Sequence, residues 1–246
     1  MATKPKLLIQ GSSWTVGAYK PSDTPNSDDL VPGGLAELLS SDYTVTNISM
    51  QDDFNLGCIL RLKEHLANHG PYDKLLICQN DPLRDLVVLR STDYTWTRLF
   101  RLSMDQLLLY KVNTLTKLLD FLTDKFYHEL SKLQIPTVVF AGPSKVNTDL
   151  AKKHGLSAIE RSWTQVLVPE FAGSHMESST ELLGAMKLIQ HMFPDKSLII
   201  KQELCDYSDE IADMLNTWQC RPELFARHHP TPLGNLLFYQ HIRELL

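Results

Sequence analysis

Short apolar runs alternate with longer amphipathic stretches along this chain. Runs of apolar and β-branched residues predict strands, each bounded by glycine, proline or polar residues. The predicted strands cover residues 7–10, 43–48, 74–78 and 137–141, with a shorter candidate at 197–200. The run at 74–78 is apolar after its lysine, which is typical of a strand buried on both faces of a sheet.

The segments between these runs carry apolar residues at helical spacing. They predict helices over residues 33–41, 55–69, 104–133, 181–192, 206–220 and 232–246. Strands that alternate with helices favour an α/β fold, with a parallel sheet covered by helices on both faces. With no internal repeat and no long linker, residues 1–246 are predicted to form a single domain.

Composition and charge exclude several classes of protein. The formal net charge is −5 with no basic stripe, so we expect no nucleic-acid partner. No run of 18 apolar residues and no signal-peptide pattern occurs, which predicts a soluble, cytoplasmic protein without membrane association. The cysteines are far apart and form no C-x-x-C pair, so neither a zinc site nor a disulfide framework is expected, and Cys78 is predicted to be a small core residue.

Polar residues with chemical potential follow the predicted strands. In parallel sheets, ligands bind beyond the carboxyl ends of the strands. Gly11 allows a sharp turn after the first strand, and Ser12 and Ser13 follow it. Asn80 follows the third strand and offers a neutral amide donor, whereas His229 lies just before the last predicted helix. A serine and a late histidine are the components of a nucleophile and its general base.

Each of these features also has a structural explanation when it is taken alone. A Gly-Ser-Ser sequence is usually a turn or a helix cap, and Asn-Asp-Pro is an ordinary turn signal. A histidine pair before a proline is compatible with a solvated loop. The residues predicted to form a solvated helix face are Arg84, Asp85 and Arg90, and those predicted to serve in packing are Trp14 and residues 94–96.

Taken together, the motifs resemble the SGNH (GDSL-type) hydrolase family. The matching elements are a strand followed by Gly-x-Ser-x-Thr-x-Gly, an Asn-Asp pair after the third strand and a late His-Pro-Thr, in that order along nearly the whole chain. The resemblance implies a flavodoxin-like three-layer sandwich with a parallel sheet of about five strands. It also implies that Ser13 is the nucleophile and donates its backbone N–H to an oxyanion, that Asn80 supplies the oxyanion amide, and that His229 is the general base.

The sequence departs from the family pattern at three positions. Ser12 stands where the family has aspartate, and Asp52, with its backbone N–H as the implied oxyanion donor, is the best match for the family's oxyanion-hole glycine. Ala226 stands three residues before His229, where the family has its supporting acid. The resemblance therefore implies a Ser–His dyad, and no spacing argument assigns the acid to Glu223.

We interpret the sequence as that of a serine ester hydrolase that acts on small O-acyl esters, including acylated sugars, and needs no cofactor. The alternative is a catalytically silent binding or assembly protein with the same fold, which the missing acid favours. A nucleotide or flavin protein is disfavoured, because the first turn lacks G-x-G-x-x-G. A metal site at His228, His229 and Asp81 is set aside, since adjacent histidines seldom point toward one ion.

Overall fold

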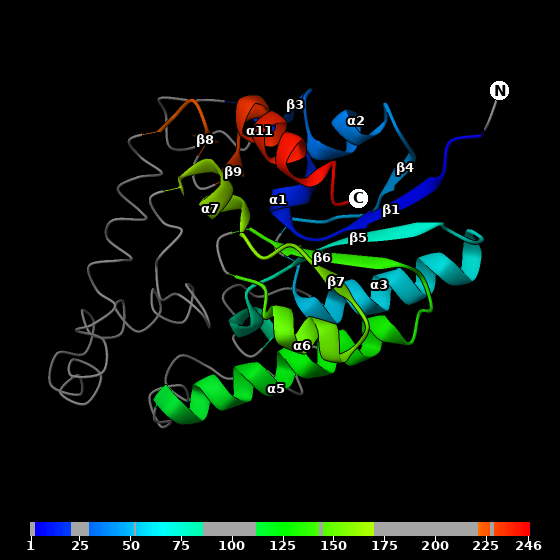
Figure 1. Ribbon diagram of the computed structural model, residues 1–246, viewed down its shortest axis with the longest axis vertical. Helices are drawn as coiled ribbons and strands as arrows, with labels where there is room; N and C mark the ends of the chain where they lie inside the picture. Colours follow the sequence, from blue (N-terminus) through cyan, green and yellow to red (C-terminus); the bar gives the residue numbers. More distant parts are fainter. Residues whose placement is uncertain are drawn as a thin grey trace, which may run out of the picture.

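A parallel sheet forms the centre of the molecule (Figure 1). The computed structural model describes residues 3–20, 30–51, 53–85, 112–142, 145–169, 221–226 and 229–246. Within these ranges the sheet has five strands in the order β4-β1-β5-β6-β7. Counted along the chain this order is 2-1-3-4-5, the flavodoxin-like arrangement, so the predicted fold class is confirmed. The strands are β1 (Lys6–Gln10), β4 (Thr44–Asn47), β5 (Lys74–Gln79), β6 (Thr137–Ala141) and β7 (Ser157–Ala158).

Four of the strands agree with the prediction to within two residues at each end. The fifth strand of the described sheet, β7, was missed, because two residues are too few to carry a periodic pattern. The candidate at residues 197–200 lies outside the described residues, and so do the helices predicted over 181–192 and 206–220. The prediction of a single domain across residues 1–246 stays a prediction.

Helices cover both faces of the sheet (Figure 1). On one face lie α3 (Asn55–Asn68), α5 (Val112–Ser131) and α6 (Thr148–Lys153). On the other lie α1 (Ser13–Val16), α2 (Leu35–Leu39), α7 (Trp163–Leu167) and α11 (Pro232–Ile242). The short helices α6 and α7 were not predicted, although Asn147 and Ser162 cap their first turns as such residues commonly do.

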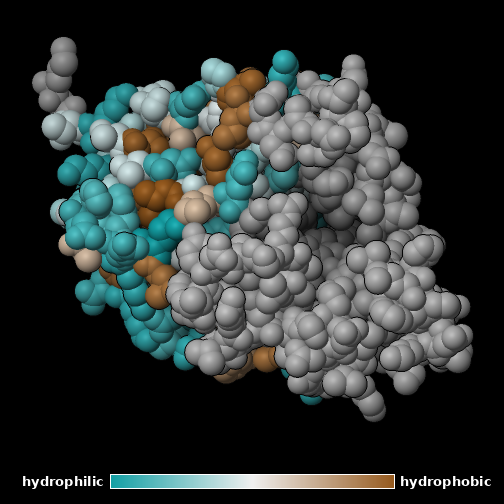
Figure 2. Space-filling model, turned by 180° about the vertical axis from the view of Figure 1, so that it is seen from behind, coloured by the Kyte–Doolittle hydropathy of each residue, from teal (hydrophilic) through white to brown (hydrophobic). Residues whose placement is uncertain are grey.

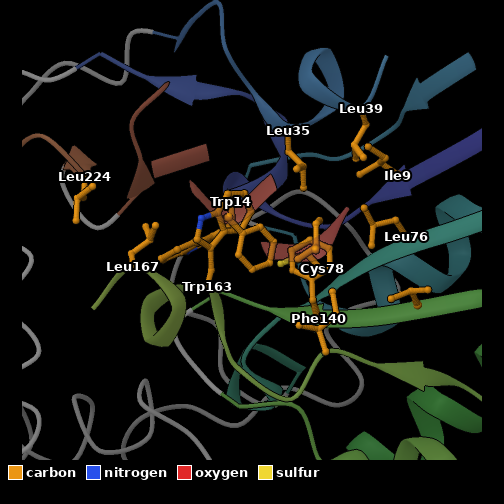
Figure 3. Packing of buried hydrophobic residues seen from close by; sticks show 14 of the residues in the cluster. Ile9, Trp14, Leu35, Leu39, Leu76, Cys78, Phe140, Trp163, Leu167 and Leu224 are labelled. Carbon is orange, nitrogen blue, oxygen red and sulfur yellow. The ribbon is translucent and has the colours of Figure 1, made fainter. Parts of the chain in front are cut away.

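The sheet separates two hydrophobic clusters, because alternate residues of each strand point to opposite faces. Leu8 packs with side chains of α3 and α5 in a largely aliphatic cluster. Leu7 and Ile9 belong to the other cluster, which includes Cys78 and is rich in aromatic rings (Figure 3). These rings belong to Trp14, Phe140, Trp163, Phe225 and Phe238. Cys78 is fully buried there, which confirms its prediction as a small core residue.

Two short antiparallel ribbons lie beside the aromatic cluster. One joins β2 (Ala18–Tyr19) to β3 (Leu30–Val31), and the other joins β8 (Phe225–Ala226) to β9 (His229–Pro230). The strand β9 packs against β2, α1 and α11. Neither ribbon was predicted, and the packing of β9 against β2 brings residues from the two ends of the chain together.

The described part of one face of the molecule carries both hydrophilic and hydrophobic side chains (Figure 2). In Figure 2, brown hydrophobic side chains appear as patches separated by teal hydrophilic ones over the described half of that face. Among the helices whose residues are described, none combines the length and the apolar character that crossing a membrane requires.

Candidate active site

The strand order reverses between β1 and β5, which is where ligands bind in open parallel sheets. The two strands are in register with Gln10 opposite Ile77. Ser13 and Asn80 each lie three residues beyond that pair, so both are at the carboxyl edge of the sheet. The topology therefore puts two of the residues singled out from the sequence at this edge.

A close approach of two strand ends shapes the turn after β1. A Cβ atom on Gly11 would lie 2.6 Å from the Cβ atom of Cys78 and 2.5 Å from Oγ1 of Thr15, so this position requires glycine. The carbonyl of Ser12 accepts hydrogen bonds of 3.0 Å from both the N–H and the hydroxyl of Thr15. These contacts fix the turn that carries Ser13, whose exposed fraction is 7%.

His229 reaches this turn from the far end of the chain. The Ser13 Oγ and His229 Nε2 atoms are 2.8 Å apart, so a neutral imidazole with Nε2 unprotonated accepts the serine hydroxyl. Thr231 anchors the histidine segment, because its hydroxyl donates to the Glu223 carbonyl and accepts from the N–H of Gly234. The serine whose hydroxyl meets the imidazole is thus Ser13.

The rings of Tyr19 and Trp14 lie beside the His229 imidazole. The Tyr19 ring is stacked on the His229 ring, with centroids 4.4 Å apart and planes inclined by 21°. Trp14 meets it edge-on at 6.3 Å and also contacts Trp163. Trp14 is 6% exposed, so its prediction as a packing residue is confirmed. Gly142 leaves room for it, since a Cβ there would lie 2.7 Å from the indole (Figure 3 shows Trp14 among the core residues).

The residue directly opposite His229 in the β8–β9 ribbon is Ala226. Side chains at such paired positions share one face and have Cβ atoms about 5 Å apart. A methyl group therefore lies where a side chain at this register would reach the imidazole. Glu223, the nearest preceding acid in the sequence, has an exposed side chain.

The backbone of Asn80 is held by one side chain from α3, that of Asn55. The Asn55 Oδ1 atom accepts the backbone N–H of Asn80 at 2.8 Å, and the Asn55 Nδ2 atom donates to the Asn80 carbonyl at 3.1 Å. The Asn80 amide donates to the Cys58 sulfur at 3.5 Å. With 4% of its surface exposed, Asn80 is fixed through its backbone and its side chain.

A buried carboxyl group completes this arrangement. Asp85, in the 3₁₀ turn η1 (Pro82–Asp85), accepts from the Asn55 amide and from the Leu56 N–H, each at 3.0 Å. Burial raises the pKa of Asp85 to about 7, and those two hydrogen bonds oppose the rise. The prediction of a solvated face at Asp85 was wrong, because its side chain binds the first turn of α3 and is 4% exposed.

A second buried carboxylate belongs to Asp53. Its Oδ2 atom accepts from the Gln10 amide and from the Arg61 guanidinium, each at 3.0 Å, and from the Cys58 thiol at 3.4 Å. Burial and the nearby Asp53 charge raise the pKa of Cys58, so its thiol stays protonated and donates to that carboxylate. Neither Asp53 nor Asn55 was singled out from the sequence, although polar residues at the start of a helix are common partners for a neighbouring loop.

Several sequence predictions concern residues that the structure does not describe. These are Asp52, His228, Arg90, residues 94–96 and the side chain of Arg84. The role of the Asp52 N–H in an oxyanion hole therefore stays a prediction. Within the described ranges, no group of three or more His, Cys, Asp or Glu side chains is arranged to hold a metal ion.

Comparison with protein-family models gives no match. Comparison with curated proteins gives none either.

Solved structures with a similar course of the chain include esterases. A mutant of Axe2, an acetyl-xylooligosaccharide esterase from Geobacillus stearothermophilus, is 11% identical with a TM-score of 0.44, over 99% of this chain and 95% of that one. AlinE4, an SGNH-hydrolase family esterase, is 14% identical with a TM-score of 0.41, over 80% and 98%. TesA is 13% identical with a TM-score of 0.39, over 78% of this chain and 98% of that one.

Proposed function

We propose that this protein is a serine ester hydrolase in which Ser13 is the nucleophile and His229 the general base. The observation that carries the proposal is the 2.8 Å separation between Ser13 Oγ and His229 Nε2 at the carboxyl edge of the sheet. A nucleophile within hydrogen-bond reach of a base is the arrangement that activates a serine hydroxyl. The substrates we expect, from the resemblance in the motifs, are small O-acyl esters, including acylated sugars.

The chemistry proceeds in two halves. His229 Nε2 takes the hydroxyl proton as Ser13 Oγ attacks the acyl carbonyl carbon, which forms a tetrahedral oxyanion. The oxyanion collapses, the bond to the leaving alcohol breaks, and the imidazolium gives its proton to that alcohol. Water then attacks the acyl-serine ester with His229 again as base, which releases the acid and restores Ser13.

Three donors are proposed for the oxyanion. They are the backbone N–H of Ser13, the backbone N–H of Asp52 and the side-chain amide of Asn80. The Asn80 amide has two N–H groups, so donating one to Cys58 leaves the other for the oxyanion. Because Asn55 holds both backbone groups of Asn80, this donor is fixed before substrate binds, as electrostatic stabilisation requires.

One observation favours a second candidate, a binding or assembly protein that keeps the fold without turnover. Ala226, opposite His229, brings only a methyl group to the position from which a carboxylate would orient and stabilise the imidazolium. In serine proteases with a Ser-His-Asp triad, replacing that carboxylate by an amide lowers turnover by about 10⁴. Reactivity of Ser13 itself separates the two candidates.

The test is labelling with a fluorophosphonate probe, followed by peptide mapping, between pH 6 and 9. We expect labelling at Ser13 in the wild-type protein and its loss in Ser13→Ala and in His229→Ala. Ser12→Ala is the matched control, since the Ser12 side chain makes no capping hydrogen bond in α1, and we expect this variant to be labelled at the wild-type rate. No labelling of folded wild-type protein would sink the hydrolase proposal in favour of the binding protein, and labelling at Ser12 would reverse the assignment of the nucleophile.

A further inference from the structure

Tyr19 lies closer to the His229 imidazole than Trp14 does. The Tyr19 and His229 rings are nearly parallel, with planes 21° apart and centroids separated by 4.4 Å. The same imidazole directs its Nε2 atom to Ser13 Oγ. One face of the histidine is thus covered by a phenol ring while its edge meets the serine.

The Tyr19 ring is itself held in place. Tyr19 is paired with Leu30 in the β2–β3 ribbon, and its hydroxyl accepts from the Gln51 amide at 3.4 Å. Only 2% of its surface is exposed. A ring fixed by backbone pairing, burial and a hydrogen bond restricts rotation of any ring stacked on it, because turning the imidazole would require Tyr19 to move.

We propose, on the basis of the hydrolase function above, that Tyr19 is a positioning residue for His229. Its ring keeps the imidazole in the plane from which Nε2 faces Ser13, and its π face stabilises the imidazolium that forms when the Ser13 proton arrives. A cation over an aromatic face is attracted by the ring quadrupole, and the attraction grows when water is excluded. The aromatic face thus takes over part of the orienting and charge-stabilising work for which Ala226 offers only a methyl group.

The effect of Tyr19 on the His229 imidazolium can be separated from effects of the other described elements that pack against β9. The helix α1 and the strand β8 carry no titratable side chain. On α11, Tyr239 donates its hydroxyl to Asp42, and His241 lies near Arg161. Tyr19 is therefore the titratable side chain of these elements that faces the imidazole.

The test compares Tyr19→Leu with Tyr19→Phe by NMR titration of the ¹⁵N-labelled His229 imidazole. Leucine fills much of the space without a π face, whereas phenylalanine keeps the ring and removes only the hydroxyl. We expect His229 to become protonated about half a pH unit lower in Tyr19→Leu than in the wild type, and Tyr19→Phe to follow the wild type. Phe126→Leu is the matched control, since it removes a fully buried ring from the cluster on the opposite face of the sheet.

The rate of fluorophosphonate labelling gives the second readout. We expect it to fall about fivefold in Tyr19→Leu, with its half-maximal pH also lowered, and to stay within about twofold of wild type in Tyr19→Phe. We expect Phe126→Leu to lower the free energy of unfolding without changing the half-maximal pH of labelling, which separates positioning from packing.

Equal titration of His229 in the wild type and in folded Tyr19→Leu would overturn the inference. A loss in Tyr19→Phe as large as in Tyr19→Leu would also overturn it, because the hydroxyl would then be responsible. Absence of labelling in the wild type contradicts the proposed function instead. In that case the NMR titration still supports or overturns the effect of the stacked ring on the imidazolium.

Discussion

The two halves of the candidate active site are held by different forces. On the Asn80 side, Asn55 and the buried carboxyl groups of Asp53 and Asp85 form a network of directional hydrogen bonds. On the His229 side, the described neighbours of the imidazole include the rings of Tyr19 and Trp14, together with the hydroxyl of Ser13. The Asn80 half consists of buried polar groups that hydrogen-bond to one another, whereas the His229 half consists largely of aromatic rings.

This difference predicts that the two halves respond differently to substitution and to pH. A buried polar network loses a large amount of free energy when one member is removed, because its partners then lack hydrogen bonds. It also depends on pH where its members titrate. Stacked rings fix an orientation through shape and contact area, and each stack contributes only about 0.5–1.5 kcal/mol beyond burial. The Asn80 half should therefore dominate stability, whereas the His229 half tunes reactivity.

The largest expected effect is that of Asn55→Ala. The substitution removes the partner of the Asn80 N–H, of the Asn80 carbonyl and of one Asp85 oxygen. We expect the free energy of unfolding to fall by about 3 kcal/mol, since each buried polar group left unpaired costs roughly 1–3 kcal/mol. The corresponding fall in Tm, measured by calorimetry, is about 6–12 °C for a chain of this size.

Asn68→Ala is the matched control on the same helix. Asn68 is exposed at the end of α3 and donates to the Glu64 carbonyl at 2.8 Å. Its loss should change the free energy of unfolding by no more than about 0.5 kcal/mol. Equal effects of the two substitutions would contradict the view that the Asn80 half depends on its network.

The next effect concerns pH and the substitution Asp85→Asn. Burial raises the pKa of Asp85 to about 7 in the folded protein. The stabilisation that this group provides is complete below its unfolded value, about 3.9, and is lost as the pH rises through 7. The wild type should thus lose about 2 kcal/mol of stability from this group between pH 5.5 and 8, and Asp85→Asn should not.

Calorimetry at the two pH values measures this difference. The gap in Tm between pH 5.5 and pH 8 should narrow by about 4–8 °C in Asp85→Asn relative to the wild type. Asp73→Asn, at an exposed carboxylate just before β5, should keep the wild-type gap. An unchanged gap in Asp85→Asn would show that this carboxyl group titrates at the same pH in the folded and unfolded chains.

The parts of this site that sequence analysis predicts are those with a local signal. Four strands were found because runs of apolar residues end at glycine or polar residues, and Gly11 marked the turn that only a glycine fits. Ser13 and His229 are 216 positions apart in the sequence, and their Oγ and Nε2 atoms are 2.8 Å apart in the structure. The sequence motifs predicted both residues. Asn80 was named by its place after the third predicted strand.

The supporting residues carry no such signal. Asn55 and Asn80 are 25 positions apart, Gln10 and Asp53 are 43, and a buried polar residue looks like an exposed one until its partner is known. Asp85 was for this reason predicted to be solvated. The two-residue strands that hold Tyr19 and His229 are too short for a period, so the stack between them follows from tertiary structure alone.

A carboxylate introduced beside His229 would test how the aromatic half of the site responds to a charged group of the kind that the Asn80 half contains. Ala226→Asp places an acid opposite His229, within reach of the imidazole. We expect fluorophosphonate labelling of Ser13 to become about tenfold faster, because a carboxylate orients the imidazole and stabilises the imidazolium. The half-maximal pH should rise, since a neighbouring negative charge favours the protonated ring.

Ala226→Asn serves as the control for size and polarity without charge. It should give neither the rise in the half-maximal pH nor the full gain in rate. The aspartate variant should also be less stable at pH 8, because Ala226 is only 7% exposed and an ionised group there is poorly solvated. A slower reaction in Ala226→Asp would mean that the aromatic neighbours leave no room for a carboxylate.

The smallest effect is expected at a carboxylate outside the site, where burial is incomplete. Glu129 accepts from Lys63 and from Lys132, each at 2.6 Å, and both lysines are exposed. Hydrogen bonds from Lys132 and Lys63 lower the pKa of Glu129 to about 2, so its stabilising effect is present above the unfolded value and lost as the pH falls through 2.

Glu129→Gln should nevertheless lower the free energy of unfolding by less than about 1 kcal/mol at pH 7, and by less still in 1 M NaCl, because solvent and salt screen such pairs. Chemical denaturation with urea at the two salt concentrations measures this cost. If Glu129→Gln lowered the free energy of unfolding as much as Asn55→Ala does, carboxylate contacts would stabilise this protein wherever they occur. The contrast between the two halves of the site requires instead that burial decides how much each contact stabilises the fold.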